Sequence, residues 1–306
     1  MQDSQTTPTP GKPTVNDLTG TLLGNITLMK KVGEGSMGVV YRGFQSGLSR
    51  SVAVKVVFRN RFNKLFTPER FRHEAEVVAN LFHPQIVPIF EFGEQPDYLY
   101  FVMQFVEGLG LHKWLKMKKS HPMPRKRVAS MEELIPITDQ ILEVLAFAHR
   151  EGVVHRDIKP ENILMLERQN KIMVADFGLA TVNASFAEEE KAFILGSPFY
   201  VSPEQARGET VDGRADLFSL GCVLLECTLG FLPAKVERPE KIFNTRAKES
   251  PDMFSGMAKD LSPHVRPEWS DFVAKALEPK PERRFENADV MLSELRKLKN
   301  ILLPFG

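Results

Sequence analysis

The apolar residues of the chain change their spacing near residue 106. From Ile26 to that point, β-branched and aromatic residues recur in short runs between turn signals, as they do in strands. One helical run interrupts the strands and begins at Thr67 and Pro68, which suit an N-cap and a first helical position. Beyond residue 106 the apolar runs are longer and keep helical spacing, up to the almost wholly apolar segment 216–230. The pattern predicts an α+β fold of two lobes, a small antiparallel β lobe with one helix and a larger, mainly helical lobe.

The length of 306 residues and the hydrophobic share of 42% are sufficient for two lobes. Residues 1–24 contain many Thr and Pro residues and few large apolar groups, so we expect a disordered tail there. In this interpretation residues 25–106 form the small lobe and residues 107–306 form the large lobe.

The formal net charge of +1 gives the whole chain no strong attraction to nucleic acid or to a membrane, and no nucleic-acid partner is expected. The run KMKKSHPMPRKR at 116–127 is locally basic, and we interpret it as a solvated loop. No apolar run approaches the length of a membrane span, and the first residues lack the apolar core of a signal peptide. A cytoplasmic location is therefore the expectation. Cys222 and Cys227 lie in one helical segment and point to different sides, so no disulfide is expected between them.

The stretch HRDIKPEN at 155–162 crowds an acid, a lysine and an amide into one turn before an apolar strand. A polar turn set by Pro160 would explain part of this composition. A phosphate-handling loop would explain all of it, because Asp157 can accept a hydroxyl proton, Lys159 can neutralise a phosphoryl oxygen and Asn162 can bind magnesium.

A glycine-rich stretch, VGEGSMGVV, lies between the first two long strands and holds Gly33, Gly35 and Gly38. It fits either a glycine-tolerant hairpin or a flexible flap whose backbone N–H groups lie over phosphates. It does not fit a dinucleotide-binding fingerprint, because a strand and not a helix follows it.

In the next strand, VAVK, alternation places Ala53, Lys55 and Val57 on one face. An edge lysine with a partly buried stem is one interpretation. The helix after Thr67 offers another, because Glu74 falls within its apolar stripe and requires a cationic partner. That stripe consists of Phe71, Ala75, Val78 and Phe82.

With these pieces the chain resembles the eukaryotic-type (Hanks-type) serine/threonine protein kinases, whose strand lysine pairs with a glutamate on the single helix of the small lobe. The resemblance continues in order through HRDIKPEN, through VADFGLA with Asp176, and through SPE at 202–204 in the place of A-P-E. The phrases VDGRADLFSLGC and SPEQARG are similar to the bacterial branch of that family.

The resemblance implies the catalytic roles. Asp157 would orient and deprotonate a substrate hydroxyl, and Lys159 would neutralise the transferred group. Lys55, held by Glu74, would bind the α and β phosphates of ATP.

The resemblance also implies how ATP and magnesium would be held. Asn162 and Asp176 would bind the Mg²⁺ ions, and the three glycines would cover the phosphates. Apolar side chains would enclose the adenine, with Met103 at the back of the pocket and backbone groups of Gln104 and Val106 on the adenine edge. The enclosing side chains are those of Val32, Val40, Ala53, Met103 and Leu164.

Two structural pairings follow from the same resemblance. Glu204 would be buried against Arg284, and Asp216 would brace the loop 155–162, which matches the catalytic loop of the family. The activation segment between Asp176 and Glu204 holds Thr181 and Ser185, while Ser197 is expected to be structural. We advance the hypothesis that the acidic run 188–190 supplies the negative charge that phosphorylation would otherwise bring to Arg156, the alternative being a solvated acidic run.

The leading hypothesis is a magnesium- and ATP-dependent serine/threonine protein kinase that acts on proteins, including itself. A pseudokinase that serves as a binding or scaffold module is the alternative, and a small-molecule kinase is a third option. The sequence predicts no oligomeric state.

Overall fold

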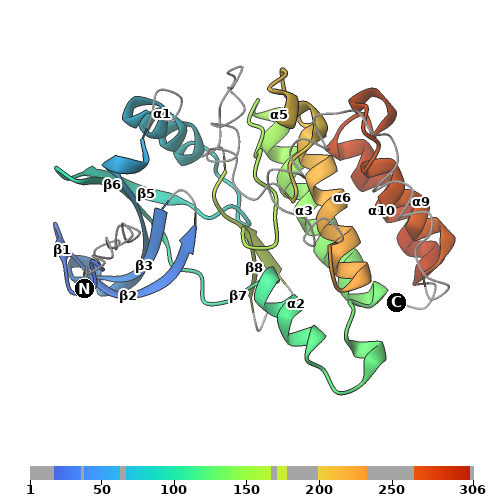
Figure 1. Cartoon of the computed structure of the whole chain (residues 1–306), viewed down its shortest axis with the longest axis horizontal. Helices are drawn as coiled ribbons and strands as arrows, with labels where there is room; N and C mark the ends of the chain where they lie inside the picture. Colours follow the sequence, from blue (N-terminus) through green and yellow to red (C-terminus); the bar gives the residue numbers. More distant parts are fainter. Residues whose placement is uncertain are drawn as a thin grey trace, which may run out of the picture.

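The computed structural model describes residues 17–35, 38–62, 67–166, 171–177, 199–232 and 265–303. The side chains of Arg61, Arg70, Glu74 and Arg125 lie outside this description. Figure 1 shows two lobes, with the long strands and one helix on the left and most helices on the right. The α+β, two-lobed arrangement expected from the spacing of apolar residues is confirmed.

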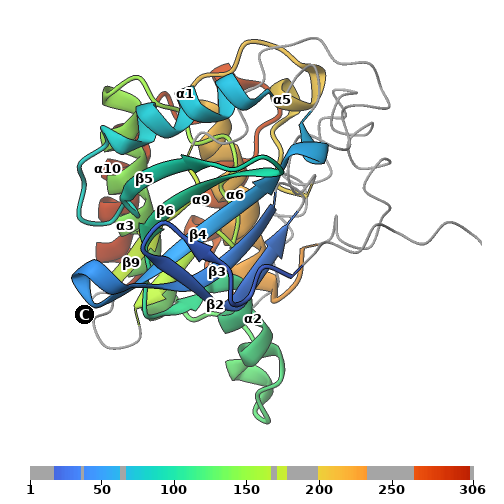
Figure 2. The same ribbon diagram turned by 90° about the vertical axis from the view of Figure 1, so that its left-hand side faces the viewer.

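The small lobe is a six-stranded antiparallel sheet in the order β1-β2-β3-β4-β6-β5. Helix α1 lies against β5 and β6 (Figures 1 and 2), where Phe71 and Ala75 pack on Phe101. The elements are β1 (Leu22–Leu23), β2 (Ile26–Gly35), β3 (Gly38–Gln45), η1 (Ser46–Leu48), β4 (Arg50–Phe58), η2 (Arg59–Arg61), α1 (Pro68–Ala79), β5 (Ile89–Glu94) and β6 (Tyr98–Gln104).

The two faces of strand β4 pack into different hydrophobic clusters. Val54 and Val56 belong to the core of the curled sheet, whereas Val57 packs toward α1 and Ala53 packs beside Met103. Lys55 lies on the same face as Ala53 and Val57 and is only 6% exposed. The alternation predicted for VAVK is therefore confirmed, and it directs the lysine inward.

The large lobe is built around α6, which is buried on nearly every side from Ala215 to Thr228. Because this helix is apolar nearly all round, it suits only the middle of a lobe. The elements are β7 (Leu109–Gly110), α2 (Leu111–Lys119), η3 (Pro124–Lys126), α3 (Met131–Arg150), β8 (Ile163–Leu166), β9 (Lys171–Val174), α5 (Pro203–Arg207), α6 (Arg214–Leu229), α9 (Pro267–Ala276), η5 (Pro281–Arg283) and α10 (Ala288–Leu302).

The ordered part of the small lobe begins earlier than Ile26. Leu22 and Leu23 pair with β2, and the Leu18 backbone N–H donates a hydrogen bond of 3.2 Å to the Tyr41 hydroxyl. Residues 17–24 therefore do not belong to a disordered tail, because backbone pairing and the burial of Leu23 hold them on the sheet. Residues 1–16 lie outside the described residues.

The prediction that Phe82 belongs to the apolar stripe of α1 is wrong. Helix α1 ends at Ala79, and Phe82 is 83% exposed. The Leu81 backbone N–H donates to the Val78 carbonyl at 3.0 Å, so the chain leaves helical spacing and buries Leu81 in its place.

The described residues bear on the expected lack of a disulfide and on membrane-spanning helices. Cys222 and Cys227 are buried free thiols, which confirms that they form no disulfide. Among the helices that the structure describes, none combines the length and the apolar character needed to cross a bilayer.

Candidate active site

The loop 155–162 between α3 and β8 brings three predicted residues into contact. Lys159 Nζ lies 2.6 Å from Asp157 Oδ2. The Asn162 side-chain amide donates to the backbone carbonyl of Asp157 at 2.8 Å and to Asp157 Oδ2 at 3.0 Å. The carboxylate is therefore oriented by a cation and an amide and is 14% exposed, so it is held in place while remaining reachable.

A buried carboxylate on α6 fixes the start of this loop. Asp216 accepts hydrogen bonds from the backbone N–H of His155 at 2.8 Å and of Arg156 at 2.7 Å. His149 Nε2, at the end of α3, lies 2.8 Å from the same carboxylate. Burial raises the pKa of Asp216, but the hydrogen bond and charge of His149, with further help from His155, outweigh it and lower the pKa. The prediction that Asp216 braces the loop is confirmed.

The segment after β9 places Asp176 opposite Lys55. The two side chains form an ion pair with 2.9 Å between Lys55 Nζ and Asp176 Oδ2. Asp176 adopts a left-handed backbone conformation, with φ of 61°. Phe177 then packs against the ring of His155, with 4.4 Å between the centroids. A non-glycine residue in this conformation is strained, and the buried Phe177 is one contact that holds it.

The charges of the site shift two pKa values in opposite directions. Burial raises the pKa of Asp176, but the charge and hydrogen bond of Lys55 outweigh burial, so the pKa is lowered. Burial lowers the pKa of Lys159, but Asp157 outweighs it, so the pKa is raised. Both groups therefore stay charged at neutral pH, which is the condition for electrostatic work on phosphate.

The side chains predicted to enclose a base gather in one apolar cluster. Ala53 and Met103 are buried, and Val40, Val106 and Leu164 pack against them while staying partly exposed. Val32 is 40% exposed and lies outside this cluster. The Gln104 backbone N–H donates to the Pro88 carbonyl at 3.1 Å. The cluster is a partly open apolar surface of the kind that receives a planar ligand.

The glycine-rich stretch is the β2–β3 hairpin. Gly35 pairs with Gly38 across it, and Ser36 and Met37 between them lie outside the described residues. A Cβ on Gly38 would come within 2.1 Å of the Val56 carbonyl oxygen, while one on Gly35 would meet nothing within 4 Å. Gly33 lies opposite Val40 in the same hairpin. Of the three glycines in this stretch, only Gly38 is therefore required by packing against the described residues.

Two oxygens of the site suit a divalent cation. Asp176 uses Oδ2 for Lys55, which leaves its Oδ1, and Asn162 uses its amide nitrogen for Asp157, which leaves its side-chain oxygen. The Ala175 backbone N–H donates to the Asn162 carbonyl at 2.9 Å, which ties the two residues together. Carboxylate and amide oxygens are the ligands that Mg²⁺ prefers, and it commonly takes only one or two carboxylates alongside phosphate oxygens.

Some predictions lie outside the described residues. The side chain of Glu74 is one, so its pairing with Lys55 stays a prediction. Thr181, Ser185, Ser197 and the acidic run 188–190 are the others.

The sequence reasoning missed two residues that support the loop. His149 is one, and Gln205 is the other, since its side-chain amide donates to the Arg156 carbonyl at 2.9 Å. The only sequence signal for Gln205 is its place after the S-P-E segment, at the third position of a helix capped by Ser202.

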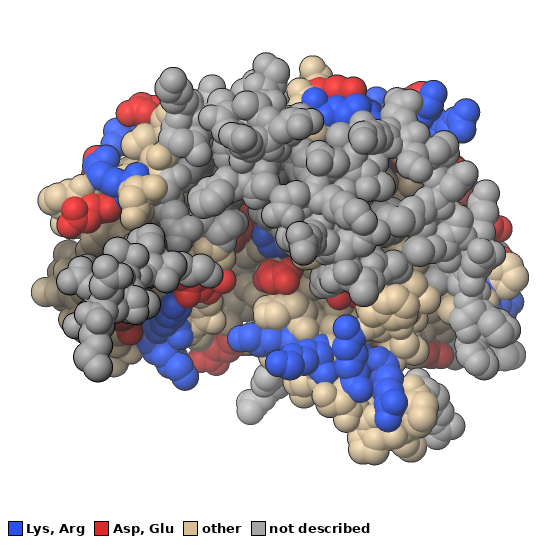
Figure 3. All heavy atoms as spheres, viewed as in Figure 1, with Lys and Arg blue, Asp and Glu red and all other residues tan. Residues whose placement is uncertain are grey.

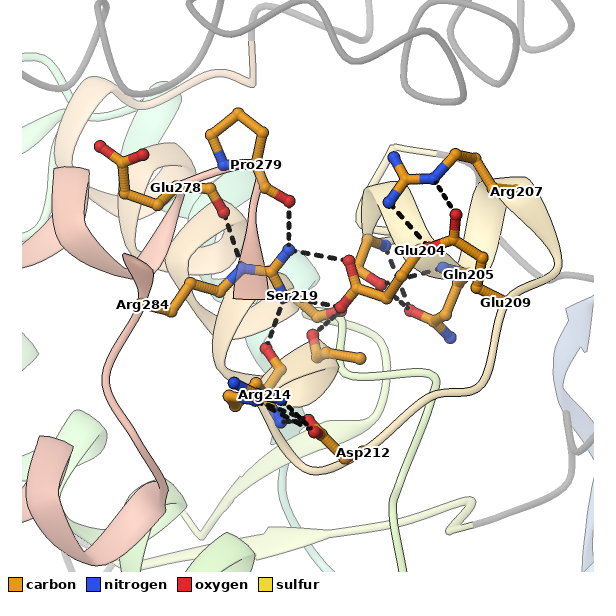
Figure 4. A network of polar contacts seen from close by, with 12 residues as sticks. Glu204, Gln205, Arg207, Glu209, Asp212, Arg214, Ser219, Glu278, Pro279 and Arg284 are labelled. Atoms are coloured by element: carbon orange, nitrogen blue, oxygen red, sulfur yellow. Dashed lines mark hydrogen bonds and ion pairs between the residues drawn. The ribbon is translucent and has the colours of Figure 1, made fainter. Parts of the chain in front are cut away.

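A buried ion pair locks α5 to the lobe. Arg284 Nη1 and Nη2 lie 2.6 Å and 2.8 Å from the two carboxylate oxygens of Glu204, a bidentate arrangement. Arg284 also donates to the backbone carbonyls of Arg214, Glu278 and Pro279 (Figure 4). The predicted pairing of Glu204 with Arg284 is confirmed.

Comparison with known proteins agrees with this geometry. A family model described as the protein kinase domain matches residues 26–295. Serine/threonine-protein kinase PrkC of Bacillus subtilis is 34% identical over 275 residues, covering 89% of this chain and 40% of PrkC. Serine/threonine-protein kinase PknB of Mycolicibacterium smegmatis is 35% identical over 270 residues, covering 86% of this chain and 41% of PknB.

A solved structure gives the same result for the fold. The crystal structure of the PknI kinase domain of Mycobacterium tuberculosis has a TM-score of 0.71 at 25% sequence identity, covering 91% of this chain and 98% of that domain. The chain spans about 40% of the length of the curated relatives it matches. The chain belongs to the protein kinase family, in its bacterial, Hanks-type serine/threonine branch.

Proposed function

We propose that this chain transfers the γ-phosphoryl group of ATP to serine and threonine hydroxyls of proteins, including its own. The single observation that carries the proposal is the contact of Lys159 and Asn162 with Asp157, at 2.6 Å and 3.0 Å, in a loop adjoining the Lys55–Asp176 pair. Membership of the protein kinase family supports the use of ATP and Mg²⁺ in general.

Asp157 serves as the general base in this proposal. Its carboxylate takes the proton as the hydroxyl oxygen forms a bond to the γ-phosphorus and the bond from that phosphorus to the bridging oxygen of ADP breaks. Lys159, whose pKa is raised, stays protonated and offsets the charge on the transferred group.

The nucleotide lies between the two lobes in this proposal. Lys55 binds the α and β phosphates, with Glu74 as its further partner, and Asp176 and Asn162 hold Mg²⁺, which neutralises phosphate charge. Val40, Ala53, Met103 and Leu164 contact the adenine, and Gln104 and Val106 contribute backbone groups to its edge. Val32, Gly33, Gly35 and Gly38 cover the nucleotide from above.

The test is intact mass before and after incubation with Mg²⁺ and ATP, on phosphatase-treated wild type and on Asp157→Asn, with casein added in a parallel reaction. We expect phosphoryl groups on the wild type and on casein, and none with Asp157→Asn. An unmodified wild type with unmodified casein would contradict the proposal and favour the pseudokinase alternative. Phosphorylation by both proteins would remove Asp157 from the role of base.

A further inference from the structure

A basic projection extends from the large lobe. It consists of residues 111–127, which include α2 and η3, and we call it the basic finger. The finger contains seven Lys and Arg residues and no Asp or Glu. The whole chain has a formal net charge of +1 and the finger has +7, so all other residues together carry −6. The molecule is therefore strongly polarised toward the finger.

The finger stands out from the body of the protein. In both ribbon views α2 and the following turn extend below the other described elements (Figures 1 and 2). Figure 3 shows Lys and Arg side chains gathered along α2. A projection of this kind can approach an extended surface without obstruction by the rest of the described molecule.

Contacts at the base hold the finger in place. Lys118 Nζ lies 2.6 Å from Glu133 Oε2 at the start of α3 and 4.7 Å from the ring centroid of Trp114. The Ala129 backbone N–H donates to the Cys227 carbonyl of α6 at 3.1 Å. The orientation of the exposed cations is therefore set by the folded lobe, and little ordering is needed when they bind.

The outer face of α2 is cationic with an apolar centre. Leu111 and Leu115 are buried, and helical geometry places Lys113, Lys116 and Met117 on the opposite side. Met117 is 63% exposed. Further along the finger Met123 is 38% exposed, beside the exposed Lys126 and Arg127. Cations that surround exposed apolar side chains are typical of segments that lie in the headgroup region of a membrane.

Three exposed lysines of the finger have no acidic partner among the described residues. Lys113, Lys116 and Lys119 make no ion pair within the described residues, although all three are exposed. Several exposed cations elsewhere have acidic partners, as in Arg150–Asp289 and Arg296–Asp139. Three unpaired cations held in one fixed segment leave their charge available to a partner.

We propose that the basic finger docks this protein on an anionic lipid surface, with Met117 and Met123 entering the headgroup layer. A convex projection with cations on several sides suits a planar surface, whereas an acidic peptide is normally bound along a groove or a sheet edge. Each cation close to an anionic leaflet strengthens binding by roughly fivefold, so the effect of several is large. The inference does not depend on the catalytic proposal.

The test is co-sedimentation of the full chain with vesicles of phosphatidylcholine, with and without phosphatidylglycerol. The finger variant is Lys113→Gln/Lys116→Gln/Lys119→Gln. The matched control is Lys280→Gln/Lys297→Gln/Lys299→Gln, which removes the same charge from exposed positions in the last part of the chain. A second pair compares Met117→Gln with Ile301→Gln, since both side chains are well exposed.

We expect the wild type to bind only the vesicles that contain phosphatidylglycerol. The finger variant should bind on the order of a hundredfold more weakly, from roughly fivefold for each cation, while the control stays close to wild type. Met117→Gln should weaken binding more than Ile301→Gln does. Circular dichroism of every variant checks that the fold is retained.

Three results would overturn the proposal. The wild type could remain in the supernatant with anionic vesicles at low salt. The finger and control variants could lose the same affinity, which would indicate a general charge effect. Soluble poly-L-glutamate could bind the wild type more tightly than the vesicles do, which would assign the finger to acidic protein partners.

Discussion

Lys55 on β4 of the small lobe and Asp176 after β9 of the large lobe form an ion pair of 2.9 Å across the two lobes. The lysine proposed to bind phosphate is thus paired with the carboxylate proposed to hold Mg²⁺. Each residue neutralises the other in the structure described here, so both charges are preserved in a site where an unpaired charge would be costly.

Asp176→Asn should abolish most phosphoryl transfer. The change keeps the shape of the side chain but removes the charge that attracts the cation, and a loss of about 10²- to 10³-fold in the transfer rate is expected. Initial rates with labelled ATP measure it. Asp271→Asn, at an exposed position on α9, is the control and should retain the wild-type rate. A wild-type rate for Asp176→Asn would exclude this carboxylate from cation binding.

Arg284→Met should destabilise the large lobe, because Glu204 would remain buried without its bidentate partner. Breaking a buried pair by removing one member costs about 3–5 kcal/mol of unfolding free energy. Urea unfolding followed by tryptophan fluorescence measures this change. The double variant Glu204→Leu/Arg284→Met removes both charges and should recover part of the stability. If the double variant is less stable than Arg284→Met alone, the uncompensated charge is not the cause.

Gly38→Ala and Gly35→Ala test the glycine-rich hairpin with the same added methyl group. At Gly38 the new Cβ would lie 2.1 Å from the Val56 carbonyl oxygen, so β3 must move away from β4. We expect a loss of about 1–3 kcal/mol in unfolding free energy there. At Gly35 nothing lies within 4 Å, and the same measurement should show little change. Equal losses at the two positions would contradict this account of the hairpin.

The buried His155 should make stability depend on pH. Burial lowers the pKa of its imidazole from 6.5, and the nearby carboxylates of Asp216 and Asp157 only partly oppose this. The unfolded chain therefore binds a proton that the folded chain excludes, so this contribution to stability is present above about pH 6.5 and is lost as the pH falls.

Urea unfolding at about pH 7.5 and about pH 5.5 measures the effect, which is at most about 1.4 kcal/mol per pH unit for one histidine. His155→Asn should show a smaller difference between the two pH values than the wild type. His73→Asn, whose side chain is 77% exposed, should keep the wild-type difference. An unchanged difference in His155→Asn would assign the pH dependence to other groups.

The local features of the site could be predicted because short-range rules govern them. Strand alternation directed Lys55 inward, and the apolar pattern of α6 identified a helix in the middle of a lobe. The resemblance to a known family supplied the long-range pairing of Glu204 with Arg284, since nothing in the spacing of those residues brings them together.

Other features depend on tertiary packing and could not be found in the same way. Phe82 continued the periodicity of α1, but the helix ends before it because Leu81 fills the core instead. Residues 17–24 follow a tail rich in Thr and Pro and show no strand alternation, and the edge of β2 gives them a place to pair. His149 and Gln205 are ordinary polar residues until the fold brings them to the catalytic loop.

Asp216 should make two backbone amides of the catalytic loop exchange their hydrogens unusually slowly for a loop. The backbone N–H groups of His155 and Arg156 donate hydrogen bonds to a carboxylate on α6, which is buried from Ala215 to Thr228. Local fraying cannot free these amides, so their hydrogen exchange should proceed by global unfolding and should be as slow as that of the core of α6. Asp157, the proposed base, would therefore be carried by a segment without regular structure that opens only when the whole lobe does.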